Sequence, residues 1–92
     1  METLPFLRID DKVIVKSPYE ISSIKGIRNM KHIDGKIYAT YKGMSYEIYS
    51  EEEMQYIGDT GVVVSGVYDT YLRVRMSDGV VKLFPHFALK LN

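Results

Sequence analysis

Two histidines, His32 and His86, are the side chains in this sequence best suited to acid–base chemistry or to binding a metal ion. They lie far apart in the chain, and neither belongs to an HxH or HExxH motif that would set two ligands side by side. Without cysteine, the chain offers no thiol nucleophile and no thiolate ligand. We therefore expect no metal site. We interpret His86 as a structural residue and His32 as part of a mostly apolar hairpin face.

Three consecutive glutamates, Glu51 to Glu53, and the segment Gly58-Asp-Thr-Gly61 are the other places to look for catalytic chemistry. Adjacent residues on a helix do not face each other, so the glutamates do not form a carboxylate pair for acid–base catalysis. The glycine segment lacks the lysine and the long following helix of a phosphate-binding loop. The sequence thus predicts a protein that is not an enzyme and uses no cofactor.

A sheet face that mixes basic and aromatic side chains is the main candidate for function. Apolar and polar residues alternate from 71 to 76, which directs the odd-numbered side chains outward and the even-numbered ones inward. Arginine and tyrosine are enriched where binding energy concentrates, so this face predicts a docking surface for an acidic protein. The alternative is a solvated sheet face whose charges are offset by nearby acidic residues. The candidate partner-binding residues are Tyr71, Arg73, Arg75, Lys82 and Phe84.

A second region also interleaves tyrosine with basic residues. It lies in and around the segments that flank Asp34-Gly35. Ordinary solvation of a hairpin accounts for it equally well. The secondary binding candidates are Lys31, Lys36, Tyr38 and Lys42.

Asp78-Gly79 is the turn that must position the first candidate surface. Asp-Gly between alternating segments favours a two-residue type I′ turn, because both central residues need positive φ. That turn sets Arg75 opposite Lys82 and Arg73 opposite Phe84, all on the outer face. The apolar residues expected on the inner face are Leu72, Val74, Met76, Val81 and Leu83.

Further elements follow from local signals along the chain. A strand is expected over 12–17 with Val13 and Val15 inward, followed by a loop from Ser17-Pro18 to Gly26. Asp34-Gly35 predicts a hairpin between residues 28–33 and 36–41. Lys42-Gly43 is a weaker turn signal that would add a third strand over 44–48.

Ser50 and Glu53 have the spacing of a capping box, which predicts a short helix over about 50–57. Gly58 then ends the helix in the left-handed region. Among the eight tyrosines, we expect Tyr41, Tyr46 and Tyr56 in the core. The tyrosines expected to be exposed are Tyr19, Tyr49, Tyr68 and Tyr71.

Short strands, glycine-marked bends and a single helical turn over 85–88 before a last strand at 89–91 predict a mainly β protein. The expected architecture is a small SH3-like antiparallel β-barrel. Residues 1–11 are expected to be a partly flexible lead-in. Residues 12–92 would form a single domain with a hairpin inserted at about 28–49.

The composition is that of a small globular protein, with 92 residues of which 46% are hydrophobic and 26% charged. Twelve basic and twelve acidic residues give no net charge, which counts against affinity based mainly on phosphate contacts. The apolar runs are too short to cross a bilayer, so no membrane partner is expected. The absence of cysteine favours a reducing compartment, and we expect a cytoplasmic protein.

Two stretches carry a resemblance to known proteins. Tyr41-x-Gly43 followed by residues 50–62, SEEEMQYIGDTGV, resembles a pattern in small proteins encoded by bacteriophages and prophages. The tail, from Gly58-Asp-x-Gly through Asp78-Gly79 and Pro85 to residues 88–91, resembles SH3-like modules such as the mind-bomb/HERC2 repeat. The matching residues are turn glycines and core valines. The resemblance implies a fold and assigns no catalytic residue.

These observations predict a non-enzymatic binding module. The resemblance implies a phage-encoded accessory factor that docks on a protein of the host cell, in the host cytoplasm, to inhibit or redirect it. One alternative is a small barrel that binds nucleic acid through an aromatic and basic sheet face. The other is a structural subunit that associates with itself, with residues 12–17 as an edge that pairs between chains.

Overall fold

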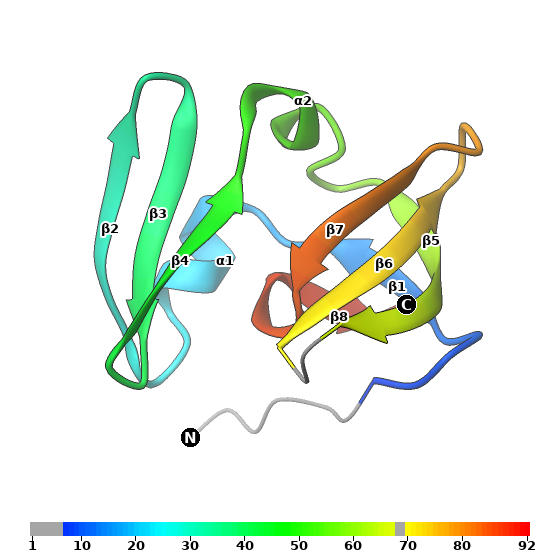
Figure 1. Cartoon of the computed structure of the whole chain (residues 1–92), viewed down its shortest axis with the longest axis horizontal. Helices are drawn as coiled ribbons and strands as arrows, with labels where there is room; N and C mark the ends of the chain where they lie inside the picture. The colour runs from blue at the N-terminus through cyan, green and yellow to red at the C-terminus, as the bar shows by residue number, and fades with distance from the viewer. Residues whose placement is uncertain (1–6, 68–69) are drawn as a thin grey trace.

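Eight strands and three short helices make up the part of the chain that the structure, a computed structural model, describes: residues 7–67 and 70–92 (Figure 1). Most of these residues lie in strands, so the prediction of a mainly β protein is confirmed. The elements are β1 (Lys12–Val15), α1 (Pro18–Ser22), β2 (Ile27–Ile33), β3 (Lys36–Tyr41), β4 (Met44–Tyr49), α2 (Glu51–Met54), β5 (Thr60–Val67), β6 (Tyr71–Met76), β7 (Val81–Pro85), the 3₁₀ helix η1 (His86–Ala88) and β8 (Leu89–Leu91).

One of the two sheets has five antiparallel strands in the order β7-β6-β5-β1-β8. The 3₁₀ turn η1 precedes the last strand, as expected. No strand pairing joins β7 to β8 within the described ranges, so this sheet is not closed into a barrel. Strand β1 lies between β5 and β8, and the prediction that residues 12–17 form a free edge was therefore wrong.

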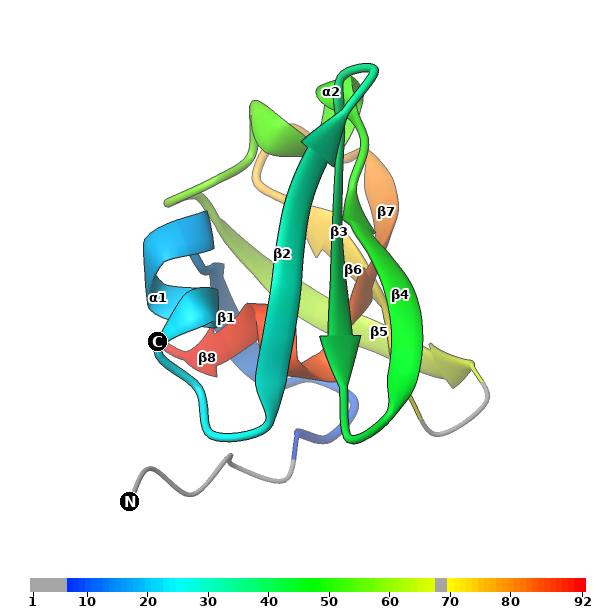
Figure 2. The same cartoon turned by 90° about the vertical axis from the view of Figure 1, so that its left-hand side faces the viewer.

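The other sheet contains β2, β3 and β4 and is inserted between β1 and β5, on the left in Figure 1 and toward the viewer in Figure 2. Asp34 and Gly35 both have positive φ, as do Lys42 and Gly43. Both connections are therefore two-residue turns of the predicted kind, and the third strand, held by the weaker Lys42-Gly43 signal, is present. We call β2–β3–β4 the insert sheet.

The hydrophobic core lies where the inner faces of the two sheets and the helices meet. Val13, Val15 and Val74 contribute from the five-stranded sheet, as their alternation predicted. Ile37 and Ala39 contribute from the insert sheet. Aromatic rings of both sheets and of η1 pack edge to face or tilted at their meeting point, which adds to the burial of apolar area. The ring pairs are Tyr41–Phe87, Tyr46–Phe87, Tyr46–Tyr71 and Tyr49–Phe84.

A β-bulge in β4 changes which tyrosines are buried. The pairing shifts between Ile37 and Tyr38, so that Ile48 and Tyr49 both point inward. Tyr49 is fully buried, and its hydroxyl donates a 2.6 Å hydrogen bond to the carbonyl of Lys16. Burial raises the pKa of Tyr49 far above its usual value. The expectation that Tyr49 is exposed was wrong, because a bulge breaks the period of two on which it depended.

The remaining tyrosines mostly follow the expectation. Tyr41 and Tyr56 are buried and Tyr46 is half-buried. Tyr19 is exposed, whereas Tyr71 is only half-exposed. Tyr68 lies outside the described residues.

The two α-helices each begin with a capping box. At the start of α2 the Glu53 backbone N–H donates to the Ser50 hydroxyl and the Ser50 backbone N–H donates to the Glu53 carboxylate, as predicted, and Gly58 has a φ of +86°. The helical residues end at Met54, so α2 is one turn long and shorter than the expected range of about 50–57. Residues 18–22 were expected to be a loop but form α1, because Ser17 and Glu20 make a second capping box with Pro18 in the first turn.

The segment before β1 is joined to β5. Asp10 donates a backbone hydrogen bond to the carbonyl of Val63, and Val63 donates one to the carbonyl of Asp11. Leu7 packs against the core. The predicted lead-in also covers residues 1–6, which lie outside the described residues. None of the described helices has the length and apolar character needed to cross a membrane.

Candidate functional site

The loop between β6 and β7 determines which side chains the main candidate surface presents. Gly79 donates to the carbonyl of Met76, and Met76 donates to the carbonyl of Val80. Gly79 alone in this loop has positive φ (+88°), so Asp78-Gly79 is not a type I′ turn. The loop contains three residues, Ser77 to Gly79, which is the next most common hairpin connection. The predicted two-residue turn was wrong.

The longer loop moves the register of β7 by one residue. Arg75 lies opposite Val81 and Arg73 opposite Leu83. Lys82 and Phe84 lie opposite Val74 and Leu72 and so point to the other side of the sheet.

Two of the five predicted partner-binding residues therefore leave the outer face. Phe84 is fully buried, with its ring 5.9 Å from that of Tyr49. Lys82 forms an ion pair with Glu52 of α2, with 2.7 Å between Nζ and Oε2. The hydrogen bond to Glu52 raises the pKa of Lys82. Neither side chain can belong to a common surface with Arg73 and Arg75.

The alternation predicted for β6 is confirmed. Arg73 and Arg75 are exposed, and Val74 and Met76 are buried. Tyr71 is half-buried, and its ring makes an edge contact with Tyr46 of the insert sheet. Burial raises the pKa of Tyr71. Part of the Tyr71 side chain is thus buried in the contact between the two sheets.

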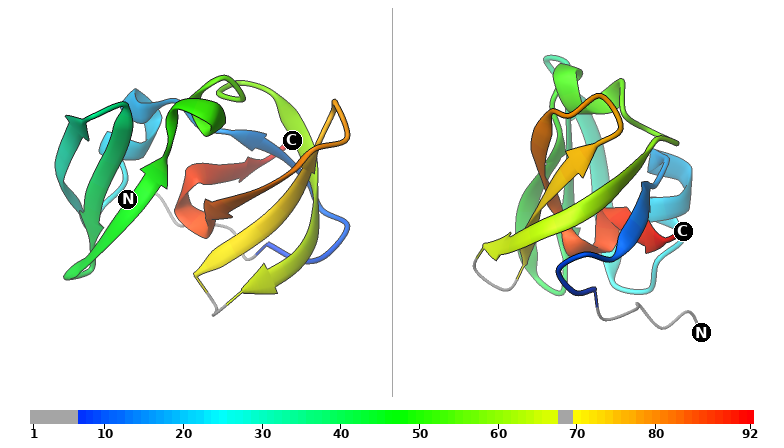
Figure 3. Two further views of the ribbon diagram at one scale, coloured as in Figure 1. Left: turned by 45° about the horizontal axis from the view of Figure 1, so that its top comes forward. Right: turned by 90° about the vertical axis from the view of Figure 1, so that its right-hand side faces the viewer.

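Two neighbouring cross-strand rows on the outer face of β5, β6 and β7 contain the arginines. One row contains Val62, Arg75 and Val81. In the other, Arg73 lies between Ser65 and Leu83. Figure 3 shows this side of the five-stranded sheet in its right-hand view, with the insert sheet behind it. We call the surface formed by Val62, Ser65, Arg73, Arg75, Val81 and Leu83 the arginine face.

The arginine face combines positive charge with exposed apolar area. Val81 and Leu83 are 47% and 43% exposed, respectively, and flank the two arginines. Arg73 donates a long hydrogen bond to the Ser65 hydroxyl (3.4 Å). Neither arginine forms an ion pair with any residue in the described ranges. The guanidinium groups are therefore available to an anionic group from outside.

A hollow of about 390 Å³ adjoins one end of the arginine face. Lys12 and Arg75 both line it, and Val62 lies between them in the strand register. Thr60 and Ser77 add hydroxyl groups. Two cations around an apolar residue form a suitable place for a carboxylate side chain.

The second predicted region is divided by the structure. Lys31 lies directly opposite Tyr38 on the outer face of the insert sheet. Lys36 is on the same face and pairs with Glu47 at 3.3 Å, which raises the pKa of Lys36. Lys42 lies in the β3–β4 turn, with Nζ 5.3 Å from the centre of the Tyr41 ring. Lys31, Lys36 and Tyr38 thus share a face, and Lys42 lies at its end.

Of the residues that were considered for catalysis, His32 is exposed on the insert sheet, whereas His86, Glu52 and Glu53 have structural contacts. His86 is half-buried, and its Nδ1 lies 3.2 Å from the carbonyl oxygen of Thr70. Burial lowers the pKa of His86. Glu53 caps α2, and Glu52 pairs with Lys82. In the described ranges, no three His, Asp or Glu side chains are grouped so that they could hold a metal ion.

Sequence reasoning missed the contact that orders the β6–β7 loop. The hydroxyl of Tyr56 donates a 2.7 Å hydrogen bond to Oδ2 of Asp78, while Oδ1 accepts from the Val80 backbone at 3.0 Å. The Val80 contact has a recognisable signal, because aspartate often bonds the backbone two residues on. The Tyr56 contact joins residues 22 positions apart in the sequence and has no local signal.

Comparison of the chain with protein-family models, with curated proteins and with solved structures found no match.

Proposed function

We propose that this protein is a non-enzymatic binding module that docks on an acidic protein partner through the arginine face. The observation that carries the proposal is the cross-strand arrangement of Arg73 and Arg75 with the exposed side chains of Leu83 and Val81. Interfaces gain most of their binding energy from a few arginine and large apolar or aromatic side chains that lose water together. A solvated sheet face has no need for two exposed aliphatic residues beside unpaired arginines.

The hollow between Lys12 and Arg75 supports an acidic partner. An aspartate or glutamate of the partner would accept charge-assisted hydrogen bonds from Lys12 and Arg75 there. Residues of the partner beside that carboxylate would cover Val62 and Val81. The absence of net charge agrees with a local electrostatic contact and not with general attraction to polyanions.

The resemblance to small phage-encoded proteins extends this proposal. According to this resemblance, the partner is a protein of the host cytoplasm, and binding inhibits or redirects that partner. The resemblance also makes the fold an SH3-like module, and the strand order β7-β6-β5-β1-β8 with η1 before β8 supports this assignment. In that description the insert sheet is an elaboration of the loop between β1 and β5.

A capture experiment with matched charge reversals tests the arginine face. The bait proteins are the wild type, Arg73→Glu/Arg75→Glu, and the control Arg28→Glu/Lys31→Glu, which changes the charge equally on the insert sheet. All four residues are exposed, so the thermal unfolding midpoints should remain close to that of the wild type.

We expect a partner from a lysate of the host cells that is retained by the wild type and by the insert-sheet control, and is lost with Arg73→Glu/Arg75→Glu. Titration of the purified partner should then give similar affinities for the wild type and the insert-sheet control, and a much weaker affinity for Arg73→Glu/Arg75→Glu. Equal retention by all three baits would reject the arginine face. Equal loss from both variants would show dependence on total charge and would also reject it.

A further inference from the structure

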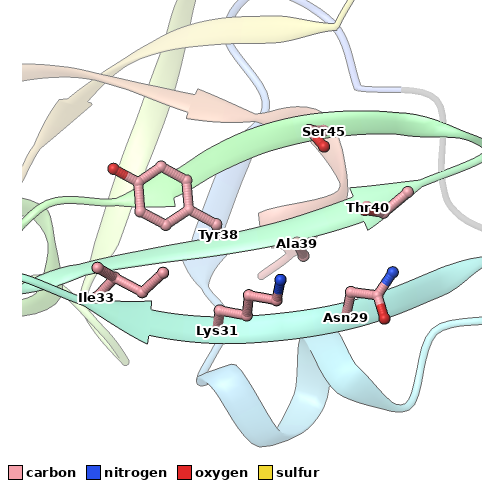
Figure 4. A pocket seen from close by; sticks show the side chains of 7 residues that line it. All are labelled: Asn29, Lys31, Ile33, Tyr38, Ala39, Thr40 and Ser45. Carbon is pink, nitrogen blue, oxygen red and sulfur yellow. The ribbon is translucent and has the colours of Figure 1, made fainter.

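A second open hollow lies on the outer face of the insert sheet. The insert sheet and strands β5, β6 and β7 lie on opposite sides of the molecule (Figures 2 and 3). The volume of the hollow is about 490 Å³. Figure 4 shows that all three strands contribute side chains to it, with the Tyr38 ring toward one end and Thr40 toward the other. The lining residues are Asn29, Lys31, Ile33, Tyr38, Ala39, Thr40 and Ser45.

The shape of this hollow has a local cause. Asn29 has a φ of +55° and belongs to a bulge, where the pairing of β2 with β3 shifts between Arg28 and Lys31. A bulge bends its strand and increases the local twist. The facing positions Thr40 and Ser45 are small, so the bent strand is not covered by long side chains.

The polar groups around the hollow are not used within the protein. The side chains of Asn29, Lys31, Tyr38, Thr40 and Ser45 form no hydrogen bond and no ion pair with any residue in ranges 7–67 and 70–92. They include amide, ammonium and hydroxyl groups, and so both donors and acceptors. This set is suited to a ligand with many polar edges.

The surrounding charge is positive. Residues 24–49 contain five basic side chains (Lys25, Arg28, Lys31, Lys36, Lys42) and two acidic ones (Asp34, Glu47). Arg28 and Lys31 point to the outer face, because they pair with Thr40 and Tyr38. Neither forms an ion pair with a described residue, whereas Glu47 is held by Lys36. An anionic ligand is therefore attracted to the β2 side of the hollow.

An aromatic ring, unpaired cations along one strand and free hydrogen-bonding groups together match the chemistry of an unpaired nucleotide strand. Every base has a π face that can stack on an aromatic ring such as that of Tyr38, which is half-buried and lines the hollow. A duplex keeps its bases stacked inside and offers no such face. A protein partner suits this surface less well, because Ile33 is the one apolar side chain among the exposed residues of its lining.

We infer that the outer face of the insert sheet binds single-stranded nucleic acid. A base stacks on Tyr38, and the adjoining phosphates lie against Lys31 and Arg28. Asn29 and Thr40 contact the polar edges of the base or the sugar. The site is separate from the arginine face, so this inference does not depend on the proposed protein partner.

Fluorescence anisotropy of labelled oligothymidylate and oligouridylate, each about 12 nucleotides long, tests the inference with the full chain. We expect Tyr38→Ala to weaken binding at least about fivefold, since stacking of one base contributes that much or more. Tyr38→Phe keeps the ring and should bind nearly as the wild type does.

Charge variants give an independent readout. For single strands, each phosphate contact contributes about −0.7 to the slope of log affinity against log salt concentration. Lys31→Gln and Arg28→Gln should each weaken binding and make the slope shallower by about 0.7. Lys12→Gln, on the five-stranded sheet, should change neither quantity. Glu47→Gln should tighten binding, because it removes the anion beside Tyr38 and releases Lys36.

Four outcomes would overturn the inference. Three concern binding: no binding of either oligonucleotide at low salt, equal binding by Tyr38→Ala and the wild type, or a loss of affinity from Lys12→Gln equal to that from Lys31→Gln. The fourth is perturbation of the Tyr38 ring resonances by a neutral oligosaccharide and not by the oligonucleotides. Arg73→Glu/Arg75→Glu should still bind them apart from a weak long-range charge effect, so the result is distinct from a failure of the arginine face.

Discussion

The hydroxyl of Tyr56 reaches across from the turn after α2 and donates a 2.7 Å hydrogen bond to Oδ2 of Asp78. Lys82 and Glu52 form an ion pair between the same two parts of the chain. The β6–β7 loop and the start of β7 are therefore each attached to the α2 segment at one point. This attachment positions the strand that carries Val81 and Leu83, two of the six residues of the arginine face.

Tyr56→Phe should raise the pKa of Asp78, because the Tyr56 hydroxyl is the main reason that this pKa is lowered. A carboxyl whose folded pKa is lowered adds stability above its unfolded pKa, about 3.9. That stability is lost as the pH falls through the lowered folded pKa. The wild type should thus be more stable than Tyr56→Phe at pH 7, and this difference should shrink in acid.

Carbon-detected NMR titration of Asp78, together with urea unfolding at several pH values, checks both parts of this expectation. Tyr19→Phe is the matched control, since Tyr19 is 84% exposed. An Asp78 pKa that is the same in Tyr56→Phe and in the wild type would contradict the assigned role of the hydrogen bond.

Phe84→Ala should destabilise the protein by about 3–5 kcal/mol, because it empties a fully buried site. Leu83→Ala should change stability by no more than about 1 kcal/mol, because Leu83 lies on the surface. A two-residue Asp78-Gly79 turn would predict the reverse order. Chemical denaturation of the two variants therefore measures the register of β7 directly.

Gly61→Ala should cost about 1–3 kcal/mol. A Cβ at Gly61 would lie 2.6 Å from Cγ1 of Val74 and 2.9 Å from the carbonyl oxygen of Arg75, and the backbone there cannot easily withdraw. Gly66→Ala is the control, because among the described residues its Cβ would meet only Leu72, at 3.7 Å. The thermal midpoint should fall for the first variant and stay nearly unchanged for the second. Equal midpoints would show that β5 and β6 are not as close as described.

His86 should make the stability depend on pH near neutrality. Burial lowers its folded pKa below the usual value of about 6.5. The unfolded chain therefore binds the proton first, so stability is full above about pH 6.5 and declines as the pH falls through the folded pKa. His86→Asn, which keeps a donor toward the carbonyl of Thr70, should flatten this part of the curve. NMR titration of the imidazole that gave a pKa above 6.5 would contradict the assignment.

Local signals in the sequence were sufficient for much of the fold. Asp34-Gly35 and the Ser50–Glu53 capping box each act over a few residues, and each formed as predicted. The alternation over residues 71–76 placed Arg73 and Arg75 outward correctly, because a strand with one buried face leaves its side chains no other choice. The Ser17–Glu20 capping box was also present in the sequence but was not recognised.

The composition of the arginine face was decided by tertiary structure. Asp78-Gly79 is compatible with a two-residue or a three-residue loop, and the two choices exchange Leu83 and Phe84 between core and surface. In the folded protein the larger aromatic ring fills the space beside Tyr49, and Tyr56 and Glu52, from the distant α2 segment, bind Asp78 of the loop and Lys82. A local pattern specifies that a strand has two faces. Which residues of the next strand lie on the buried face and which on the exposed face depends on the volume of the core space that they must fill. That volume is set by parts of the chain that are distant in the sequence.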